Sequence, residues 1–291
     1  MIPAFVNPQA GGGGPAVEAL KAAGAFDVRE VPPASLASEI RKAVKDGARR
    51  VLVAGGDGSM SIAASVLAGT DIELAILPAG TLNHLAKDLS IPLDLADAAR
   101  VAVHGKARSV DAATVNGRIF LNTSAVGTYV SFVRTRERLE KRLPYGLSSV
   151  LAAAKLIVRM PTFPITIEVE GQTRTYVTPL VFIGVGEREL KLPSLGARVP
   201  GGKAGLHVMV IRRRSGARAL AFALAAAARG TEAMARTPAL DSFIVESCRV
   251  EPKMHMAAVD GEIVRMHVPL EYRHVPGCLR VVVPLDDDQR K

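Results

Sequence analysis

The stretch Gly55-Gly56-Asp57-Gly58-Ser59 has the residue types of a phosphate-binding turn. It follows the β-branched run RVLVA and precedes an Ala-rich helical pattern. Glycines in such a strand-to-helix turn allow a tight bend that directs backbone N–H groups and the positive helix end at one point. Asp57 then has two explanations. Either it or Ser59 caps the helix, or its carboxylate helps to hold Mg²⁺ beside a bound triphosphate.

Two similar turns follow other apolar runs. One comes after residues 2–6 and reads Asn7, Pro8, Gln9, Ala10, Gly11, and the other comes after residues 72–77 and contains Gly80-Thr81. Ligands of open parallel sheets gather at the carboxyl ends of strands, so three such turns indicate one shared crevice. None matches GxxxxGK[ST] or GxGxxG, which excludes a P-loop and a dinucleotide fingerprint. Taken singly, Asn7-Pro8 is an ordinary turn and Thr81 a good helix cap.

A second acidic position, Asp260-Gly261-Glu262, lies between two apolar runs late in the chain. Asp-Gly in this setting is the ordinary signature of a type I′ hairpin turn and needs no function. Residues two apart on a strand share a face, so Glu262 could assist Asp260 if Asp260 acted as a general base. The residues alone favour the plain turn.

The elements that must position these residues change in kind along the chain. Strand-like runs at 2–6, 26–31, 50–54 and 72–77 alternate with helical stretches at 15–24, 35–46 and 59–68, which predicts βαβ units and a parallel sheet. After about residue 110, hairpins are expected at Asn116-Gly117, Glu170-Gly171 and Asp260-Gly261. Further strands are expected at 206–211, 243–250 and 279–283, and helices at 131–142, 145–158 and 217–229. We therefore expect an α/β domain at 1–111, a mainly antiparallel β domain at 112–284 and a tail at 285–291.

Composition limits the function classes. The chain of 291 residues is 48% hydrophobic and has a net charge of +9, which favours anionic partners such as nucleotides, phospholipid headgroups or nucleic acid. Aromatic content of 4% and the lack of a reading motif make nucleic acid the weakest of these, and we expect no nucleic-acid partner. Two Cys without CxxC spacing suit a reducing interior, and the first residues do not resemble a secretory signal. No apolar run reaches the roughly 20 residues of a spanning helix, so we expect a cytoplasmic protein.

Four ordered motifs resemble the diacylglycerol kinase catalytic-domain family, which includes bacterial lipid kinases and the related sphingosine and ceramide kinases. They are NPQAG near the start, GGDGS, LPAGTLNHLAKDLSIP and a late VDGE. The resemblance implies a two-domain kinase with an N-terminal parallel-sheet α/β domain like those of NAD kinase and phosphofructokinase. It also implies a C-terminal antiparallel β-sandwich and an active site in the cleft between the two, where ATP binds.

The resemblance implies roles for individual residues. Asp57 and Asp111 would organise Mg²⁺, mostly through water. Asp260 would be the base that takes the proton of a lipid hydroxyl, with Glu262 as its orienting or metal-linked partner and Asp57 as the third catalytic residue. Without the resemblance, Asp111 is a solvated carboxylate at a strand end. The residues that would bind ATP are Asn7, Pro8, Gln9, Ala10, Gly11, Gly55, Gly56, Asp57, Gly58, Ser59, Met60, Gly80, Thr81 and Asn83.

Two stretches depart from the family pattern. Asn83-His84 stands where many members have Asn-Asp, so one carboxylate of the expected metal network is missing, and His84 either donates to phosphate or simply packs. Lys203-Ala204 stands where many bacterial members carry an acidic pair that holds a structural Mg²⁺. We therefore predict no structural metal there.

A soluble kinase that acts on a lipid must visit a bilayer. The basic segment at 134–142 and the apolar run after it could approach anionic headgroups, although an ion-paired helix beside a core helix is the plainer explanation. We expect an ATP- and Mg²⁺-dependent lipid kinase for diacylglycerol or a related lipid, peripherally associated with the inner membrane face, with a homodimer left open. The alternatives are an NAD-kinase-like small-molecule kinase and a non-catalytic regulator that binds nucleotide or lipid.

Overall fold

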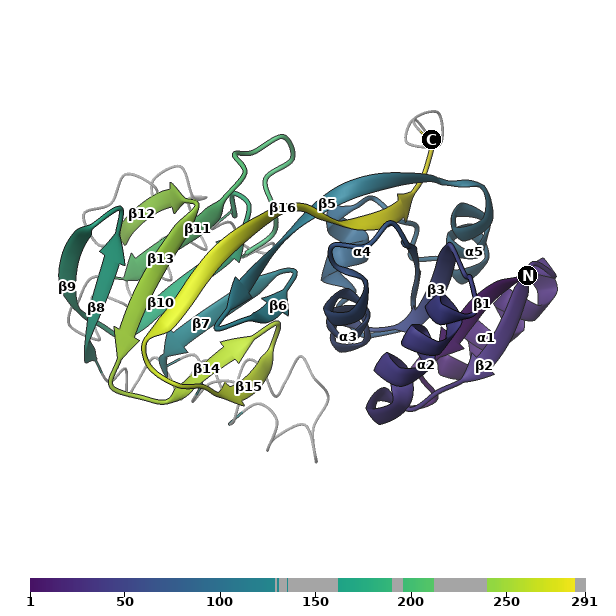
Figure 1. The fold of residues 1–291 in the computed structure, drawn as a ribbon, viewed down its shortest axis with the longest axis horizontal. Coiled ribbons are helices and arrows are strands. Elements are labelled where there is room, and N and C mark those ends of the chain that lie inside the picture. The colour runs from purple at the N-terminus through teal and green to yellow at the C-terminus, as the bar shows by residue number, and fades with distance from the viewer. Residues whose placement is uncertain (129, 131–134, 136–161, 190–195, 212–239, 286–291) are drawn as a thin grey trace, which may run out of the picture. The chain divides into compact units, whose positions relative to one another are not determined.

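The computed structural model describes the chain except for residues 129, 131–134, 136–161, 190–195, 212–239 and 286–291 (Figure 1). The chain divides into two compact units, Met1–Ala112 with Val275–Lys291, and Ala113–His274. The first division falls within a residue of the expected one. The expected second domain, 112–284, differs at its end, because residues after His274 return to the first unit.

The first unit is built on a parallel sheet with helices. Strands β1 (Ile2–Val6), β2 (Phe26–Glu30), β3 (Arg50–Gly55) and β4 (Glu73–Pro78) pair in the order β2-β1-β3-β4, and the end of β16 (Leu270–Val283) pairs parallel to β4. Helix α1 (Gly13–Ala23) packs beside α5 (Leu95–His104), and α2 (Pro33–Lys45) packs beside α3 (Asp57–Leu67). Residues 51–55 of β3 are all buried, as in a sheet covered on both faces.

The sequence predicted the four strands and three of the helices of this unit, and the structure confirms them. It did not predict α5, or α4 (His84–Asp88) as a separate short helix. The signal for α5 was present, because Asp94 is its N-cap and its carboxylate accepts from the N–H groups of Ala96 and Asp97. In the described ranges no helix has the length and apolar character needed to cross a membrane.

The second unit is an antiparallel β-sandwich, as the family resemblance implied. One sheet has the order β12-β11-β10-β7-β14-β15, and the other contains β13, β8 and β9 beside the first part of β16, with β5 and β6. The inward faces of both sheets form one apolar core that includes Phe120, Ile167, Val208 and Tyr272. The strands are β5 (Lys106–Val115), β6 (Arg118–Phe120), β7 (Thr123–Gly127), β8 (Phe163–Val169), β9 (Gln172–Thr178), β10 (Leu180–Val185), β11 (Leu206–Ile211), β12 (Leu240–Val245), β13 (Ser247–Pro252), β14 (Met256–Val259) and β15 (Glu262–Arg265).

All three predicted hairpins are present, each with a two-residue turn in which both residues have positive φ. The φ angles are 48° and 81° at Asn116-Gly117, 50° and 75° at Glu170-Gly171, and 47° and 86° at Asp260-Gly261. These are the angles of type I′ turns, whose twist matches that of the flanking strands. The glycine supplies the second angle without strain.

Other expectations for the second unit were less accurate. The single strand expected at 243–250 is wrong, because β12 and β13 lie there and pair in different sheets. The strand expected at 279–283 is the end of β16 and belongs to the sheet of the first unit. The helices expected at 131–142, 145–158 and 217–229, with the basic segment 134–142, lie outside the described residues or almost entirely so.

Candidate active site

The loops that follow β1, β3 and β4 meet at one place in the first unit, and glycine is needed where they touch. A Cβ on Gly80 would lie 2.3 Å from the Cα of Gly56, and a Cβ on Gly55 would lie 2.4 Å from Ser59 Oγ. Gly12 donates its N–H to the carbonyl of Ala79 at 3.1 Å. The three turns of the sequence prediction are therefore in mutual contact at the carboxyl ends of neighbouring strands.

The first turn of α3 keeps its backbone donors available. Its N-cap is Gly56, and no side chain caps it, so neither Asp57 nor Ser59 has the capping role that the sequence left open. The N–H groups of Asp57, Gly58 and Ser59 have no acceptor among the described residues, and the first donor used is that of Met60, to Gly56 O. Free donors at a helix N-terminus form an anion-binding position.

Asp57 caps a different helix. Its Oδ2 accepts from the N–H of His84 and its Oδ1 from that of Leu85, each at 3.2 Å, so it holds the first turn of α4. The carboxylate ties the β3–α3 turn to the loop after β4. Each oxygen retains acceptor capacity for water, because a carboxylate has about four lone-pair sites.

Asn83 shapes the loop after β4. It adopts the left-handed conformation with φ 50°, its Oδ1 accepts from Gly80 N at 3.0 Å, and its Nδ2 donates to Gly80 O at 2.8 Å. The helix expected to open at Gly80-Thr81 therefore begins three residues later, at His84, and Thr81 is exposed without a capping role. Asn83 is thus an organiser of the loop, which residue type and spacing did not reveal.

The turn after β1 is held by Asn7. Its Oδ1 accepts from Gln9 N at 2.9 Å, and its Nδ2 lies 3.5 Å from Ser59 Oγ. The exposed residues of this turn are Pro8, Gln9 and Gly11, and Ala10 is partly buried. Met60, expected to touch the nucleotide, has a side chain that is 3% exposed, so only its backbone faces the turn.

The structure does not join the second expected metal-binding carboxylate to the first. Asp111 lies in the middle of β5, and its Oδ1 accepts from Gly277 N at 2.8 Å, which ties β5 to β16. No hydrogen bond links Asp111 to Asp57 within the described part of the chain. Over the same residues, no group of three or more His, Cys, Asp or Glu side chains could hold a metal ion.

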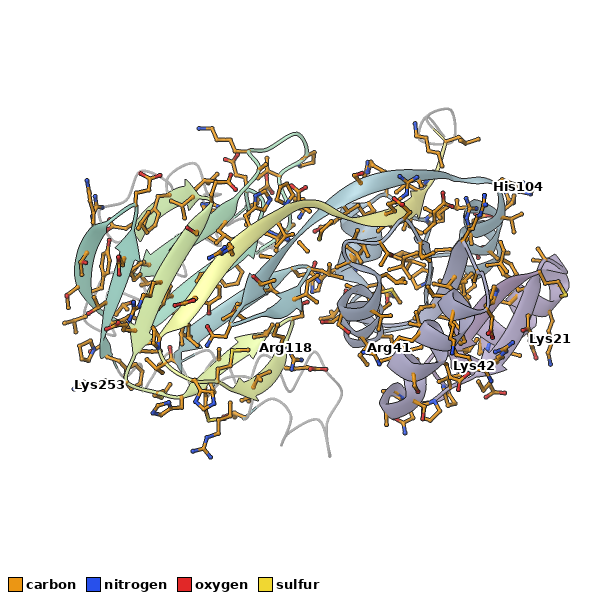
Figure 2. All side chains as sticks on the ribbon, in the orientation of Figure 1. Lys21, Arg41, Lys42, His104, Arg118 and Lys253 are labelled. Atoms are coloured by element: carbon orange, nitrogen blue, oxygen red, sulfur yellow. The ribbon has the colours of Figure 1, made fainter. Side chains whose placement is uncertain are left out.

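The acidic hairpin of the second unit is docked on the chain before β7. The carboxylate of Asp260 accepts from the N–H groups of Leu121, Asn122 and Thr123 at 2.9, 2.9 and 3.0 Å. Glu262 pairs instead with Arg118, on β6, at 2.8 Å. Arg118 is labelled in Figure 2. The turn therefore fixes the direction of the Asp260 carboxylate. These partners could not be predicted from the sequence, because every residue type except proline carries a backbone N–H donor.

The two departures from the family pattern have local partners. His84 is exposed, and its backbone N–H donates to Asp57. The backbone N–H of Lys203 donates to Glu187 Oε2 at 2.9 Å. The prediction that no structural metal binds at Lys203-Ala204 stays a prediction.

Known proteins share both the fold and part of the sequence. Two crystal structures from Bacillus anthracis str. Sterne align over 97% of this chain and 96% of their own. One has a TM-score of 0.74 at 22% identity, and the other, of a diacylglycerol kinase, has a TM-score of 0.68 at 21% identity. At this level of identity the likeness establishes the two-unit fold.

Curated relatives match over shorter stretches. Lipid kinase YegS of Escherichia coli (strain K12) is 31% identical over 152 residues, which are 50% of this chain and 50% of that protein, so the match spans about half the length of the relative. The uncharacterized protein sll0036 of Synechocystis sp. (strain ATCC 27184 / PCC 6803 / Kazusa) is 26% identical over 275 residues, 90% of this chain and 63% of that protein.

The family model of the diacylglycerol kinase catalytic domain matches residues 2–115. These residues include the three loops that meet at Gly56 and Gly80, and the Asp57 carboxylate that joins two of them. Residues 2–115 are thus similar to the diacylglycerol kinase catalytic domain.

Proposed function

We propose that this protein is an ATP- and Mg²⁺-dependent lipid kinase that transfers the γ-phosphoryl group to a hydroxyl of diacylglycerol or a related lipid. The observation that carries the proposal is the contact of the three glycine-containing loops at Gly80, Gly56 and Gly12. This packing leaves the N–H groups at the start of α3 without protein acceptors in the described residues. A phosphate chain is the kind of ligand that such donors accept.

The residues of this turn fit a nucleotide phosphate chain. Asn7 orients its own turn through Gln9 and approaches Ser59, and Asn83 fixes the loop at Gly80. These contacts hold the backbone donors in place before a ligand arrives, which reduces the ordering cost of binding. The proposal assigns Asn7–Gly11, Gly55–Met60, Gly80, Thr81 and Asn83 to ATP, with Met60 acting through its backbone.

The residues also fit Mg²⁺ in its usual protein setting, where one or two carboxylates act together with phosphate oxygens and water. Asp57 is the carboxylate beside the free donors of α3, and its oxygens retain capacity for water. Bound Mg²⁺ would neutralise negative charge on the transferred group. Asp111 is proposed to contribute through water, since its Oδ1 already accepts from Gly277 N.

Asp260 is proposed as the base for the acceptor hydroxyl. Three backbone N–H groups hold its carboxylate in one orientation, and a carboxylate held in this way can take a proton from an alcohol placed against it. Glu262 is proposed to act on the hairpin through Arg118 rather than directly on Asp260. Its expected role as a direct partner of Asp260 is thus changed to a positioning role.

The distribution of charge supports an anionic membrane surface as the place of action. Residues 113–274 contain 23 Lys and Arg against 13 Asp and Glu, whereas residues 1–112 contain 11 against 12. A concentration of positive charge in one part of a chain attracts anionic surfaces. The proposal therefore includes peripheral association with an anionic bilayer, as at the inner membrane face, and a cytoplasmic site of action.

The experiment that tests this function follows the label of γ-labelled ATP. The full chain is incubated with Mg²⁺ and total lipid extract, and the products are divided between organic and aqueous phases. Label in a new lipid phosphomonoester, lost on removal of Mg²⁺, is the expected result. Label in the aqueous dinucleotide fraction would instead favour an NAD-kinase-like enzyme.

A non-catalytic regulator has one observation in its favour, which is the engagement of Asp57 with α4. The regulator hypothesis would be favoured if calorimetry shows that ATP binds and no label is transferred to any lipid of the extract. The same calorimetry with Asp57→Asn separates the two roles of the carboxylate. Under the kinase proposal, ATP affinity in the presence of Mg²⁺ falls in this variant, because the metal loses its carboxylate, while affinity without Mg²⁺ changes little.

A further inference from the structure

A small cavity lies beside the open end of the β14–β15 hairpin in the second unit. It has a volume of about 340 Å³ and is lined by His255, Arg265, Met266 and His267. The three polar residues are exposed, and Met266 is partly buried against the core of the sandwich. The cavity is separate from Asp260, which lies in the turn at the opposite end of the hairpin.

The cavity carries the positive charge of Arg265 and offers donors that the described residues do not use. No side-chain hydrogen bond or ion pair of His255, Arg265 or His267 occurs among the described residues. Two acidic side chains that are near in the sequence have other partners: Glu251, on β13, lies 3.1 Å from Arg249, and Glu262, on β15, lies 2.8 Å from Arg118. The guanidinium has five N–H donors, and each imidazole has at least one donor, so the cavity suits a ligand rich in acceptors.

Hydrogen bonds hold the backbone of the residues that line the cavity. Met266 N donates to His255 O at 2.9 Å, which joins its two sides, and Asn116 Nδ2 donates to His267 O at 2.8 Å. The side chain of Met266 packs against the apolar core. The donors are thus carried by a segment with little freedom left to lose on binding.

We propose that His255, Arg265 and His267 form a phosphate-binding site. A phosphate group offers several acceptor oxygens and negative charge, and a guanidinium binds such groups in a forked geometry. The volume takes a single headgroup. Among the residues that the structure describes, no aromatic ring besides the two imidazoles lines the cavity, and these residues therefore provide no stacking surface of the kind that binds single-stranded nucleic acid. The ligand is the phosphate of an anionic phospholipid or of a soluble phosphomonoester.

The test uses the full chain labelled in histidine, which has six such residues, and follows their ring signals by NMR. His255→Gln and His267→Gln assign the two signals. Both should shift on titration with glycerol 3-phosphate, and Arg265→Gln should weaken the affinity about tenfold or more, because it removes a hydrogen bond to a charged group. Unmoved signals, or an unchanged affinity in Arg265→Gln, would overturn the proposal.

Lys253→Gln is the matched control. Lys253 is an exposed cation two residues before His255 that does not line the cavity, and it is labelled in Figure 2. Its loss should change the affinity less than about twofold, since an exposed charge outside the site acts only through screened attraction. An equal loss in Lys253→Gln and Arg265→Gln would refute a defined site. Unchanged thermal unfolding of both variants shows that they remain folded.

A second arm identifies the source of the phosphate. Sedimentation with vesicles of phosphatidylcholine and phosphatidylglycerol measures partition, with phosphatidylcholine alone as the reference. If the ligand is a lipid headgroup, Arg265→Gln lowers partition about fivefold, since one basic residue near an anionic surface contributes on that scale. If only glycerol 3-phosphate binding is lost, the site takes a soluble phosphomonoester. Binding of duplex DNA is measured as well. If Arg265→Gln weakens DNA binding and leaves the binding of glycerol 3-phosphate and of vesicles unchanged, the proposal is overturned.

Neither measurement requires ATP or turnover. The phosphate site and the kinase activity can therefore fail independently, and each result can be interpreted without the other.

Discussion

Gly80→Ala is the sharpest test of the loop contact on which the nucleotide proposal rests. The new Cβ would lie 2.3 Å from Gly56 Cα and 2.9 Å from Gly56 N, both backbone atoms that cannot rotate away. Ordinary contact begins at 3.4 Å, so the two loops must separate by about 1.1 Å. Overpacking of this kind costs about 1–3 kcal/mol of unfolding free energy.

The same displacement should affect function more than stability. It moves the start of α3 relative to the loop held by Asn83, and a misplacement of about 1 Å can lower a rate on the order of 100-fold. We therefore expect weaker binding of Mg²⁺–ATP by calorimetry and a loss of kcat/KM on that scale. Urea denaturation measures the change in stability.

Gly14→Ala is the matched control. Gly14 is an exposed residue of α1, and a Cβ there would have no atom within 4 Å. Alanine inside a helix is favoured over glycine by about 0.5–1 kcal/mol, so this variant should be slightly more stable and fully active. A wild-type unfolding free energy in Gly80→Ala, or an equal destabilisation in Gly14→Ala, would contradict a close contact between Gly80 and Gly56.

Three further predictions concern stability and are read by urea denaturation. Arg50→Ala should lower the free energy of unfolding by about 2 kcal/mol or more, because the guanidinium pairs with Glu73 at 2.7 Å and donates to carbonyls at the end of α5. Arg100→Ala is the control and should lower it by less than about 1 kcal/mol, because Arg100 forms an exposed ion pair on a helix. Burial lowers the pKa of His207 below 6.5, so the unfolded chain binds the proton more readily, and the stability of the wild type relative to His207→Gln should fall as the pH drops below about 6.5. A constant difference between the two proteins across that range would contradict this. Asp260→Ala should cost about 2 kcal/mol, since three backbone donors lose their acceptor, and a cost near zero would show that water replaces it.

The sequence predicted what local physics determines. Asn116-Gly117 and Asp260-Gly261 specify type I′ turns through their φ angles alone, so those hairpins could be placed from two residues each. The alternation of strands and helices in residues 1–78 likewise follows from short apolar periods. Long-range pairing has no such signal. Nothing local indicates that β12 and β13 separate into different sheets, or that the end of β16 pairs with β4.

In the candidate site, too, the local features were predictable and the long-range contacts were not. The three glycine turns were expected to share a crevice because parallel strands end at one edge, and they do meet there. Their internal bonds were not predictable, because Asp57 and Asn83 act on backbone N–H and C=O groups, which every residue type has. The capping role that the sequence left open for Asp57 is found at α4, which begins 27 residues later, and not at α3.

Asp57 and Asp260 each stabilise the local structure, and this must be separated from their proposed roles in metal binding and proton transfer. Each carboxylate holds the backbone of another segment, at residues 84–85 for the first and 121–123 for the second. Removal of either side chain therefore mixes a loss of structure with a loss of function. Being a turn residue and being a base are not competing roles for Asp260, because the turn and its three N–H bonds fix where the carboxylate points.

Asp260→Asn separates the two roles. The amide oxygen still accepts from some of the three backbone donors, so unfolding free energy should stay closer to the wild type than in Asp260→Ala, but the amide cannot take a proton. A general base contributes about 10² to 10⁴ in rate, so kcat should fall on that scale while ATP affinity, which belongs to residues of the first unit, stays unchanged. If Asp260→Asn keeps wild-type kcat at wild-type stability, Asp260 is a turn residue alone and the base must be sought elsewhere.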